Sequence, residues 1–414
     1  MEKRDQNLAP SAFRLLMNPR FASSASYDAE ARQVVSLEGL DVARAELQQW
    51  PEYAPTPLHR LEELALRCRV SEVFLKDESG RFGLGSFKAI GGAYGSLRVI
   101  QAELSTRHGI EADAVALRTG SFADQTGDIV LACATDGNHG RAVAWAAQTF
   151  GCCCEVYVPS IVSLPRRQQI EALGARVTGV DGTYDDALRA IEAVAAERGW
   201  LVVSDQSYPG CETVPRDIMQ GYAVLAHEVV EVLGDNDLPT HVFVQAGVGG
   251  FAAAVCGHLW ERLGPSRPKF VCVEPLAADC LYRSAAAGRL VHAPGDLNTV
   301  MACLSVGEAS ALGWKILGTG ATAFVAVNDA SAVEAMRFLA RPGGGQTPLV
   351  VGESGAAGVA GLMAVCGAAG ARRQLELDAG SRVLLFATEG ATDAQAYTSL
   401  VGCSPEEVGR SSRG

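Results

Sequence analysis

Short apolar segments alternate with longer amphipathic ones between Asp128 and Ser204, and this alternation limits the possible folds more than any other feature. The apolar segments are about five residues long, a length typical of strands buried on both faces. The predicted strands are 129–134, 154–158, 177–180 and 201–204, and the predicted helices between them are 141–150, 164–173 and 184–198. This order predicts a parallel sheet covered by helices.

The second half of the chain repeats the pattern. Strands are predicted over 241–245, 270–274, 323–327 and 383–387. Helices are predicted over 218–233, 330–339 and 357–366, and a further helix follows the loop at 246–250 and ends near residue 263. A chain of 414 residues can bury a large core and is long enough for two domains.

The remaining segments give weaker signals. We expect residues 1–25 to be irregular, 29–49 to be helical and 108–127 to form a polar insertion or hairpin. Residues 53–58 should be extended, because each proline disfavours the helical conformation of the residue before it. A short strand at 73–75, a helix from Lys88 to about Arg107 and a frayed tail after Glu406 complete the prediction.

Charge and cysteine usage limit the function classes. The formal net charge of -12 disfavours nucleic acid and anionic membranes as partners. We find no secretory signal and no apolar stretch of membrane-spanning length, so we expect a cytoplasmic protein. The twelve scattered cysteines, three of them consecutive at 152–154, suit neither a zinc site nor a disulfide framework and predict reduced thiols; we predict no metal site.

The segment KDESGRFGLGSFKAIGGAYG, residues 76–95, places Lys88 just after a glycine-bearing turn. Lysine amines form Schiff bases with carbonyl groups, and pyridoxal 5'-phosphate (PLP) is the commonest carbonyl cofactor. A surface lysine that opens a helix is the alternative. This segment alone does not decide between the two.

The loop AGVGG, residues 246–250, lies between a predicted strand and a predicted helix. Glycines in such a loop let backbone N–H groups approach an anion at the helix N-terminus. The loop could hold the PLP phosphate. It could also be a dinucleotide fingerprint, with Glu274 as the ribose-binding acid, or a tight structural turn.

Three further loops at predicted strand ends carry polar side chains. In TDGNHG (135–140), Asp136 is either a functional carboxylate or a helix cap, and His139 should make a structural hydrogen bond. Asp205 follows the strand at 201–204, where α/β proteins place functional groups, although it could also simply form a turn. In FATEGATD (386–393), Thr388 offers a neutral hydroxyl, Glu389 could cap, and Asp393 could begin a helix.

Together these motifs resemble a known family. SFKAIGGAYG, ATDGNHGRAVAWAA, QAGVGGFAAAV and ATEGATD are similar to motifs of the fold-type II PLP enzymes, the tryptophan synthase β-subunit group, over about residues 25–402. Within that group they are most similar to the diaminopropionate ammonia-lyases. Serine and threonine dehydratases usually have Ser-Gly-Asn-x-Gly in the second motif, whereas this chain has Asp136 before the glycine.

The resemblance implies an α/β fold of two domains with PLP in the cleft between them. Each domain would contain a mostly parallel sheet flanked by helices. The large PLP-binding domain would comprise residues 1–87 and 206–414, and the smaller one 88–205. A homodimer is also implied.

The resemblance also implies roles for individual residues. Lys88 would carry PLP covalently, Asn138 would bind the ring hydroxyl, and Thr388 would face the pyridine nitrogen. The amides of Gly247, Val248, Gly249 and Gly250 would bind the phosphate. Ser86 and the 135–138 loop, including Thr135, would bind the carboxylate of a small amino-acid substrate. Asp136 and Asp205 would lie near that substrate. The candidate catalytic residues are Lys88, Asp136 and Asp205.

The implied reaction is α,β-elimination of 2,3-diaminopropionate to pyruvate and ammonia. Diaminopropionate carries a second ammonium, for which Asp136 and Asp205 would supply counter-charge. Lys88 could act on one face of the substrate and Asp136 on the other, which would allow both D- and L-isomers. The alternatives are a serine or threonine dehydratase or a β-replacement enzyme of the same fold. Two alternatives from other functional classes also remain: a nicotinamide dehydrogenase and a ligand-binding protein without catalytic activity.

Overall fold

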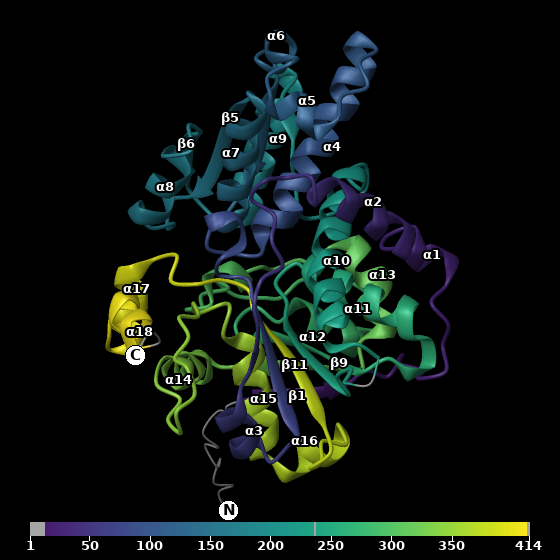
Figure 1. Ribbon diagram of the computed structural model, residues 1–414, viewed down its shortest axis with the longest axis vertical. Helices are drawn as coiled ribbons and strands as arrows, with labels where there is room; N and C mark the ends of the chain where they lie inside the picture. Colours follow the sequence, from purple (N-terminus) through teal and green to yellow (C-terminus); the bar gives the residue numbers. More distant parts are fainter. Residues whose placement is uncertain (1–12, 236, 412–414) are drawn as a thin grey trace, which may run out of the picture.

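The computed structural model describes residues 13–235 and 237–411 and contains two separate β-sheets (Figure 1). The larger sheet has five parallel strands at its centre and one antiparallel strand at each edge. Its strands, in spatial order, are β1 (Phe13–Met17), β10 (Ala323–Val327), β9 (Lys269–Pro275), β8 (His241–Gln245), β11 (Arg382–Ala387), β3 (Glu72–Asp77) and β2 (Leu58–Arg60).

The smaller sheet confirms the prediction made from the alternation between Asp128 and Ser204. All four of its strands are parallel: β6 (Arg176–Val180), β5 (Cys153–Pro159), β4 (Val130–Ala134) and β7 (Leu201–Val202). The helices α7 (Asn138–Phe150), α8 (Leu164–Glu171) and α9 (Tyr184–Arg198) connect them. All four strands lie within the predicted smaller domain, 88–205, and all strands of the larger sheet lie outside it. The domain boundaries themselves remain a prediction. We refer below to the two sheets with their helices as the small and large lobes.

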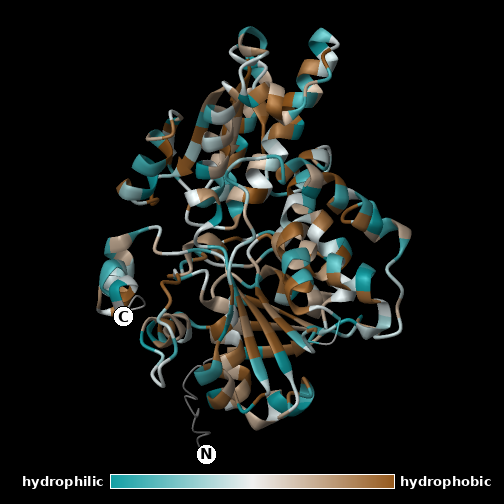
Figure 2. Cartoon of the chain, viewed as in Figure 1, coloured by the Kyte–Doolittle hydropathy of each residue, from teal (hydrophilic) through white to brown (hydrophobic). Residues whose placement is uncertain are grey.

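Alternating side chains of the larger sheet enter two different cores. Phe74, Val242 and Leu384 pack with helices on one face, whereas Val73, Phe243 and Leu385 pack on the other. The strands are accordingly apolar along almost their whole length (Figure 2). The first face is covered by α1 (Ala29–Arg32), α2 (Leu37–Leu47), α10 (Thr213–Leu233), α11 (Gly250–Leu263), α12 (Cys280–Ala287) and α13 (Ala311–Gly320). The second is covered by α3 (Glu62–Cys68), α14 (Asp329–Ala340), α15 (Ala357–Gly367), α16 (Ala369–Gln374), α17 (Ala394–Val401) and α18 (Pro405–Ser411).

The helix α4 (Lys88–His108) joins the lobes, because it packs against both α7 and α10. Its approach to α10 depends on glycine. A Cβ at Gly91 would lie 2.2 Å from the Tyr222 ring and 2.8 Å from the Ile218 carbonyl oxygen. The long predicted helix from Lys88 is therefore confirmed, and its first turns are held close to the large lobe.

Three predictions about the flanking segments were wrong. Within 1–25, residues Phe13–Met17 form the edge strand β1, while residues 1–12 lie outside the described part. For 108–127 the hairpin alternative was wrong, because the segment contains two short helices, α5 (Ala114–Arg118) and α6 (Ala123–Thr126); that it is an insertion stays a prediction. The tail predicted to fray after Glu406 is helical as far as Ser411, with Val408 buried against the large lobe, while residues 412–414 lie outside the described part.

The helix predicted over 29–49 is divided in two. The side chain of Ser36 accepts a hydrogen bond from the Gly39 N–H and starts α2 as a separate helix. Short 3-10 turns at Arg81–Gly83, Gly264–Ser266 and Ala302–Leu304 complete the list of helical elements.

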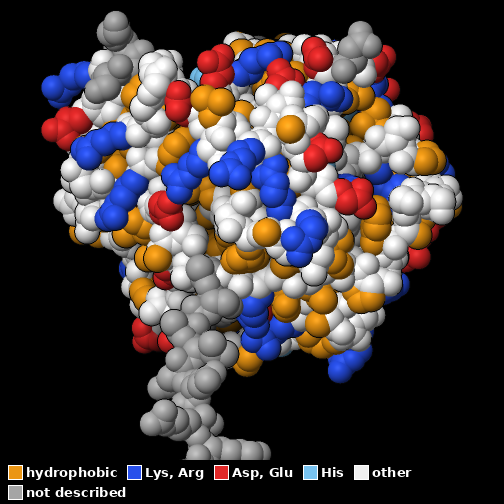
Figure 3. Space-filling model, turned by 90° about the horizontal axis from the view of Figure 1, so that it is seen from below, with side chains coloured by type: hydrophobic (Ala, Val, Ile, Leu, Met, Phe, Trp, Pro, Cys, Tyr) orange, Lys and Arg blue, Asp and Glu red, His pale blue; other side chains and the backbone are white. Residues whose placement is uncertain are grey.

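All twelve cysteines are free thiols. Among the described residues no helix is both long and apolar enough to cross a membrane. On the face shown in Figure 3, basic side chains are interspersed with acidic, apolar and neutral ones.

The glycine contact between α4 and α10 gives a stability prediction. Gly91→Ala should lower the free energy of unfolding by about 1–3 kcal/mol, because the added methyl group overpacks a backbone carbonyl and a buried ring. Gly370→Ala in α16 is the control, because nothing lies near its added Cβ and alanine favours a helix by up to about 1 kcal/mol. Chemical denaturation of both variants tests this. Equal stability of the two variants would contradict the packing argument.

Candidate active site

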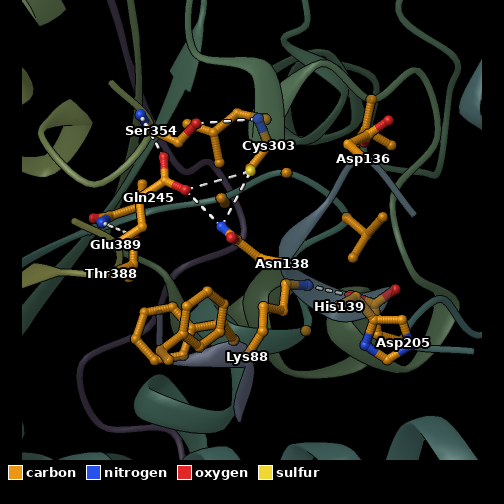
Figure 4. Close-up of a pocket in the computed structure, with 18 of the residues that line it drawn as sticks. Lys88, Asp136, Asn138, His139, Asp205, Gln245, Cys303, Ser354, Thr388 and Glu389 are labelled. Carbon is orange, nitrogen blue, oxygen red and sulfur yellow. Dashed lines mark hydrogen bonds and ion pairs between the residues drawn. The ribbon is translucent and has the colours of Figure 1, made fainter. Parts of the chain in front are cut away.

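A pocket lies where the loops that follow three parallel strands meet the start of α4 (Figure 4). The loops follow β4, β8 and β11, and parallel strands place their carboxyl ends at one edge of a sheet. The pocket is therefore built mostly from segments that the sequence singled out. Its lining includes Lys88, Thr135, Asp136, Asn138, Asp205, Gly247, Val248, Gly249, Gly250 and Thr388.

Lys88 is the first residue of α4, and its side chain is only 18% exposed. Its ammonium forms an ion pair with the Asp205 carboxylate, which follows β7 (Figure 4). Burial opposes the charged amine, yet the Asp205 carboxylate outweighs it and raises the pKa of Lys88. Burial likewise opposes the charged acid, but the Lys88 ammonium holds the pKa of Asp205 well below its usual range. This buried pair excludes the reading of Lys88 as a surface lysine.

The 247–250 loop leads into the N-terminus of α11. Gly249 has φ +92°, a conformation that favours glycine. Within the described part of the chain, no carbonyl or side chain accepts a hydrogen bond from the N–H groups of residues 247–250. Free amides at the N-terminus of a 14-residue helix form a site suited to an anion.

Asp136 also lines the pocket (Figure 4). Burial raises the pKa of Asp136 to about 7, although Arg166 lowers it and Asp205 raises it further. This carboxyl can therefore change its charge near neutral pH. It does not cap α7, because the side chain that accepts hydrogen bonds from N–H groups at that helix start is Thr135.

The other residues of the 135–140 loop are mostly engaged with the protein. The Thr135 hydroxyl accepts hydrogen bonds from the N–H groups of Gly137 and Gly140, each at 2.9 Å, and so fixes the turn. His139 lies 2.8 Å from the Val203 carbonyl oxygen, which is the structural hydrogen bond predicted for it. The Asn138 amide donates to Glu389 and accepts from Arg141 at 2.7 Å.

Ser86 does not line the pocket. It is fully buried and forms a β-bridge with Glu389. The substrate-binding role predicted for its side chain therefore has no support from its position in this structure. Thr388 does line the pocket, and its hydroxyl oxygen accepts a hydrogen bond from Gln245 at 2.6 Å.

Sequence reasoning missed several polar residues of the site. Glu389, considered only as a cap, accepts hydrogen bonds from the side chain of Asn138 and from the N–H of Ser354, at 3.1 Å for the latter. Cys303 lines the pocket beside the same carboxylate. Just outside the pocket lining, Arg166 of α8 pairs with Glu353, whose pKa rises to about 7 because of burial and the neighbouring Glu389. No short motif marks Cys303 or Glu353.

Comparisons with known proteins agree with this geometry. Residues 50–389 match the family described as pyridoxal-phosphate dependent enzyme. The chain belongs to this family. It is 40% identical to the diaminopropionate ammonia-lyase of Salmonella typhimurium over 359 residues, which cover 85% of this chain and 89% of that protein. It is 38% identical to the Escherichia coli K12 protein of that name, with 92% and 95% covered.

A solved structure extends the similarity to three dimensions. The crystal structure of the E. coli diaminopropionate ammonia lyase with an aminoacrylate-PLP azomethine reaction intermediate superposes with a TM-score of 0.84 at 37% identity. The match covers 94% of this chain and 96% of that one. The expected fold-type II architecture of the PLP enzymes is thereby confirmed.

The pocket fits PLP on the evidence of its own residues. A phosphate dianion matches the free amides of 247–250, and a buried primary amine, Lys88, lies in the same pocket. The dinucleotide reading was wrong. Glu274 is fully buried, accepts from the N–H groups of Leu281 and Tyr282, and does not line the pocket.

The phosphate assignment gives a binding prediction for this PLP enzyme. Gly249→Asp should raise the Kd for PLP about tenfold or more, because about 1.4 kcal/mol of lost affinity already changes Kd tenfold. The added Cβ would lie 3.2 Å from Leu281 and 3.3 Å from Leu317, so the charged side chain would have to displace the loop that binds the dianion, and aspartate is strained at this φ. Gly288→Asp is the control, since Gly288 also has positive φ but is exposed and remote from the pocket. Dialysis with absorbance measures Kd; equal values for the two variants would reject the assignment.

Proposed function

We propose that this protein is a PLP-dependent carbon–nitrogen lyase that converts 2,3-diaminopropionate to pyruvate and ammonia. The observation that carries the proposal is the pair of carboxylates, Asp136 and Asp205, in the pocket that contains Lys88. A hydroxy-amino acid needs only room for its hydroxyl, whereas a diamino acid brings a second ammonium that requires counter-charge. The similarity to two proteins named diaminopropionate ammonia-lyase supports the same conclusion.

The residues for holding the cofactor are Lys88, Asn138, Thr388 and the 247–250 amides. PLP supplies an electron sink that stabilises negative charge developing at the substrate Cα. Lys88 provides the amine for covalent attachment and then a proton acceptor on one face of Cα. Asp205, in contact with that amine, keeps it oriented and can exchange a proton with it. Thr388 presents a neutral oxygen, so it does not impose a charge on the ring nitrogen.

Asp136 has two proposed roles, as counter-charge to the substrate and as the second base. As a carboxylate it neutralises the β-ammonium and can remove the Cα proton from the face opposite Lys88. Two bases on two faces account for the elimination of ammonia from both D- and L-isomers. Hydrolysis of the unsaturated product by water gives pyruvate and the second ammonia. A homodimer and a cytoplasmic location remain predictions that accompany this function.

Lys88 is tested by substitution with alanine. Lys88→Ala should lose the covalent cofactor and lower kcat by about 10³-fold or more, because it removes both the attachment point and one base. Lys315→Ala is the control, since Lys315 is 37% exposed and forms an ion pair with Glu30 away from the pocket. Cofactor absorbance after borohydride treatment and pyruvate release are the readouts. Wild-type turnover by Lys88→Ala would overturn the proposed function.

Asp136 separates ammonia-lyase from dehydratase chemistry. Asp136→Asn should lower kcat for the D-isomer by about 10²–10⁴-fold and for the L-isomer less, because Lys88 still serves the L-isomer's face. Since the pKa of Asp136 lies at about 7 and a base must be ionised, wild-type kcat/KM for the D-isomer should fall as pH drops below about 7. In Asp136→Asn, kcat/KM for the D-isomer should no longer show this fall at low pH.

The matched control is Asp124→Asn, at an exposed carboxylate on α6. Steady-state kinetics on both isomers, with PLP content measured in parallel, gives the answer. Equal and small effects on both isomers would reduce Asp136 to a structural role and favour the dehydratase alternative.

A further inference from the structure

A second cavity of about 650 Å³ adjoins the active-site pocket. The two share Asp136 and Tyr184 as lining residues, so the two spaces meet at these side chains. We call this second space the outer cavity. Residues of α8 and of the loop before it line one side, and residues of α17 and of 296–300 line the other. Figure 1 shows that α8 belongs to the small lobe and α17 to the large one.

Direct contacts between the lobes border the outer cavity. Arg166 pairs with Glu353, and the Ser163 hydroxyl donates to Asp393 at 2.8 Å. Both contacts join α8, or the residue that starts it, to the large lobe. These two contacts hold the sides of the outer cavity at a fixed separation.

The outer cavity is far larger than the proposed substrate requires. A β-ammonium is about the size of a water molecule, whose share of liquid volume is about 30 Å³. The cavity, at about 650 Å³, has room for far more than one such group. Its walls mix apolar side chains, among them Val162, Val300 and Leu400, with hydroxyl and amide groups.

We propose that the outer cavity is a subsite for groups attached to the β-nitrogen, so that the enzyme also takes N3-alkylated 2,3-diaminopropionates. This inference rests on the proposed function, in which Asp136 meets the β-ammonium. Because Asp136 borders both spaces, a substituent on that nitrogen extends past it into the outer cavity. A secondary ammonium keeps the positive charge and an N–H donor for Asp136.

The reaction balances without a further reagent. The Cα–H bond breaks and its proton passes to the base, while its electron pair forms the Cα–Cβ double bond. The Cβ–N bond breaks with its electron pair on nitrogen, which leaves as an alkylamine. Water then converts the unsaturated product to pyruvate and ammonia, so each substrate gives one pyruvate, one ammonia and one amine.

Charge on the walls selects among substituents. Asp136, Asp296, Glu353 and Asp393 outnumber the guanidinium of Arg166, which is already paired with Glu353. The subsite therefore disfavours carboxylates, whereas a neutral substituent such as propyl meets no like-charge repulsion there.

The test compares 2,3-diaminopropionate with its N3-propyl and N3-(2-carboxyethyl) derivatives on the PLP-loaded protein. We expect kcat/KM for the propyl compound within about tenfold of the parent, with release of propylamine, and a lower value for the carboxyethyl compound. Ser399→Trp and Asn298→Trp place a large ring at two exposed positions of the cavity wall. Each should reduce the propyl-to-parent ratio of kcat/KM at least tenfold. Gln395→Trp, on the same helix but outside the outer cavity, should leave that ratio unchanged.

The outcomes distinguish this inference from the proposed function. Turnover of the parent without turnover of the propyl compound would overturn the subsite and leave the proposed function standing. Propyl turnover whose ratio is insensitive to both tryptophan variants would also overturn the subsite. No turnover of the parent would reject the proposed function itself.

Discussion

The buried ion pair between Lys88 and Asp205 is the interaction on which the site depends. Each charge compensates the burial of the other, and removing one would leave the other charged in a poorly solvated place. The pair also joins the start of α4, the helix that packs against both lobes, to the segment after β7 of the small lobe. Glycine packing at Gly91 holds that helix start against the large lobe.

A second set of contacts joins the lobes, with hydrogen-bond donors on the small lobe and carboxylates on the large lobe. The small lobe contributes Arg166 and the amide of Asn138, and the large lobe contributes Glu353 and Glu389. These contacts fix the loop after β4 relative to the loop after β11. Asp136 lies in the loop after β4, where the active-site pocket meets the outer cavity. Burial raises its pKa to about 7.

Much of the fold could be predicted because parallel strands leave a periodic apolar signal that survives in a single sequence. The strand-end loops containing Asp136 and Gly249 were found for the same reason, since function in such folds gathers at carboxyl ends. The prediction failed where stability comes from contacts distant in sequence. The edge strand Phe13–Met17 forms by pairing with Ala323–Val327, and Glu353 acquires its role only through Arg166.

The central claim is that a diamino acid loses both of its nitrogens in this site. Product stoichiometry tests it most directly: purified, PLP-loaded protein is incubated separately with D- and L-2,3-diaminopropionate until the substrate is consumed, and pyruvate and ammonia are both counted. The account predicts one pyruvate and two ammonia per molecule of either isomer. Absence of pyruvate from both isomers, while serine or threonine yields a keto acid and one ammonia, would contradict it.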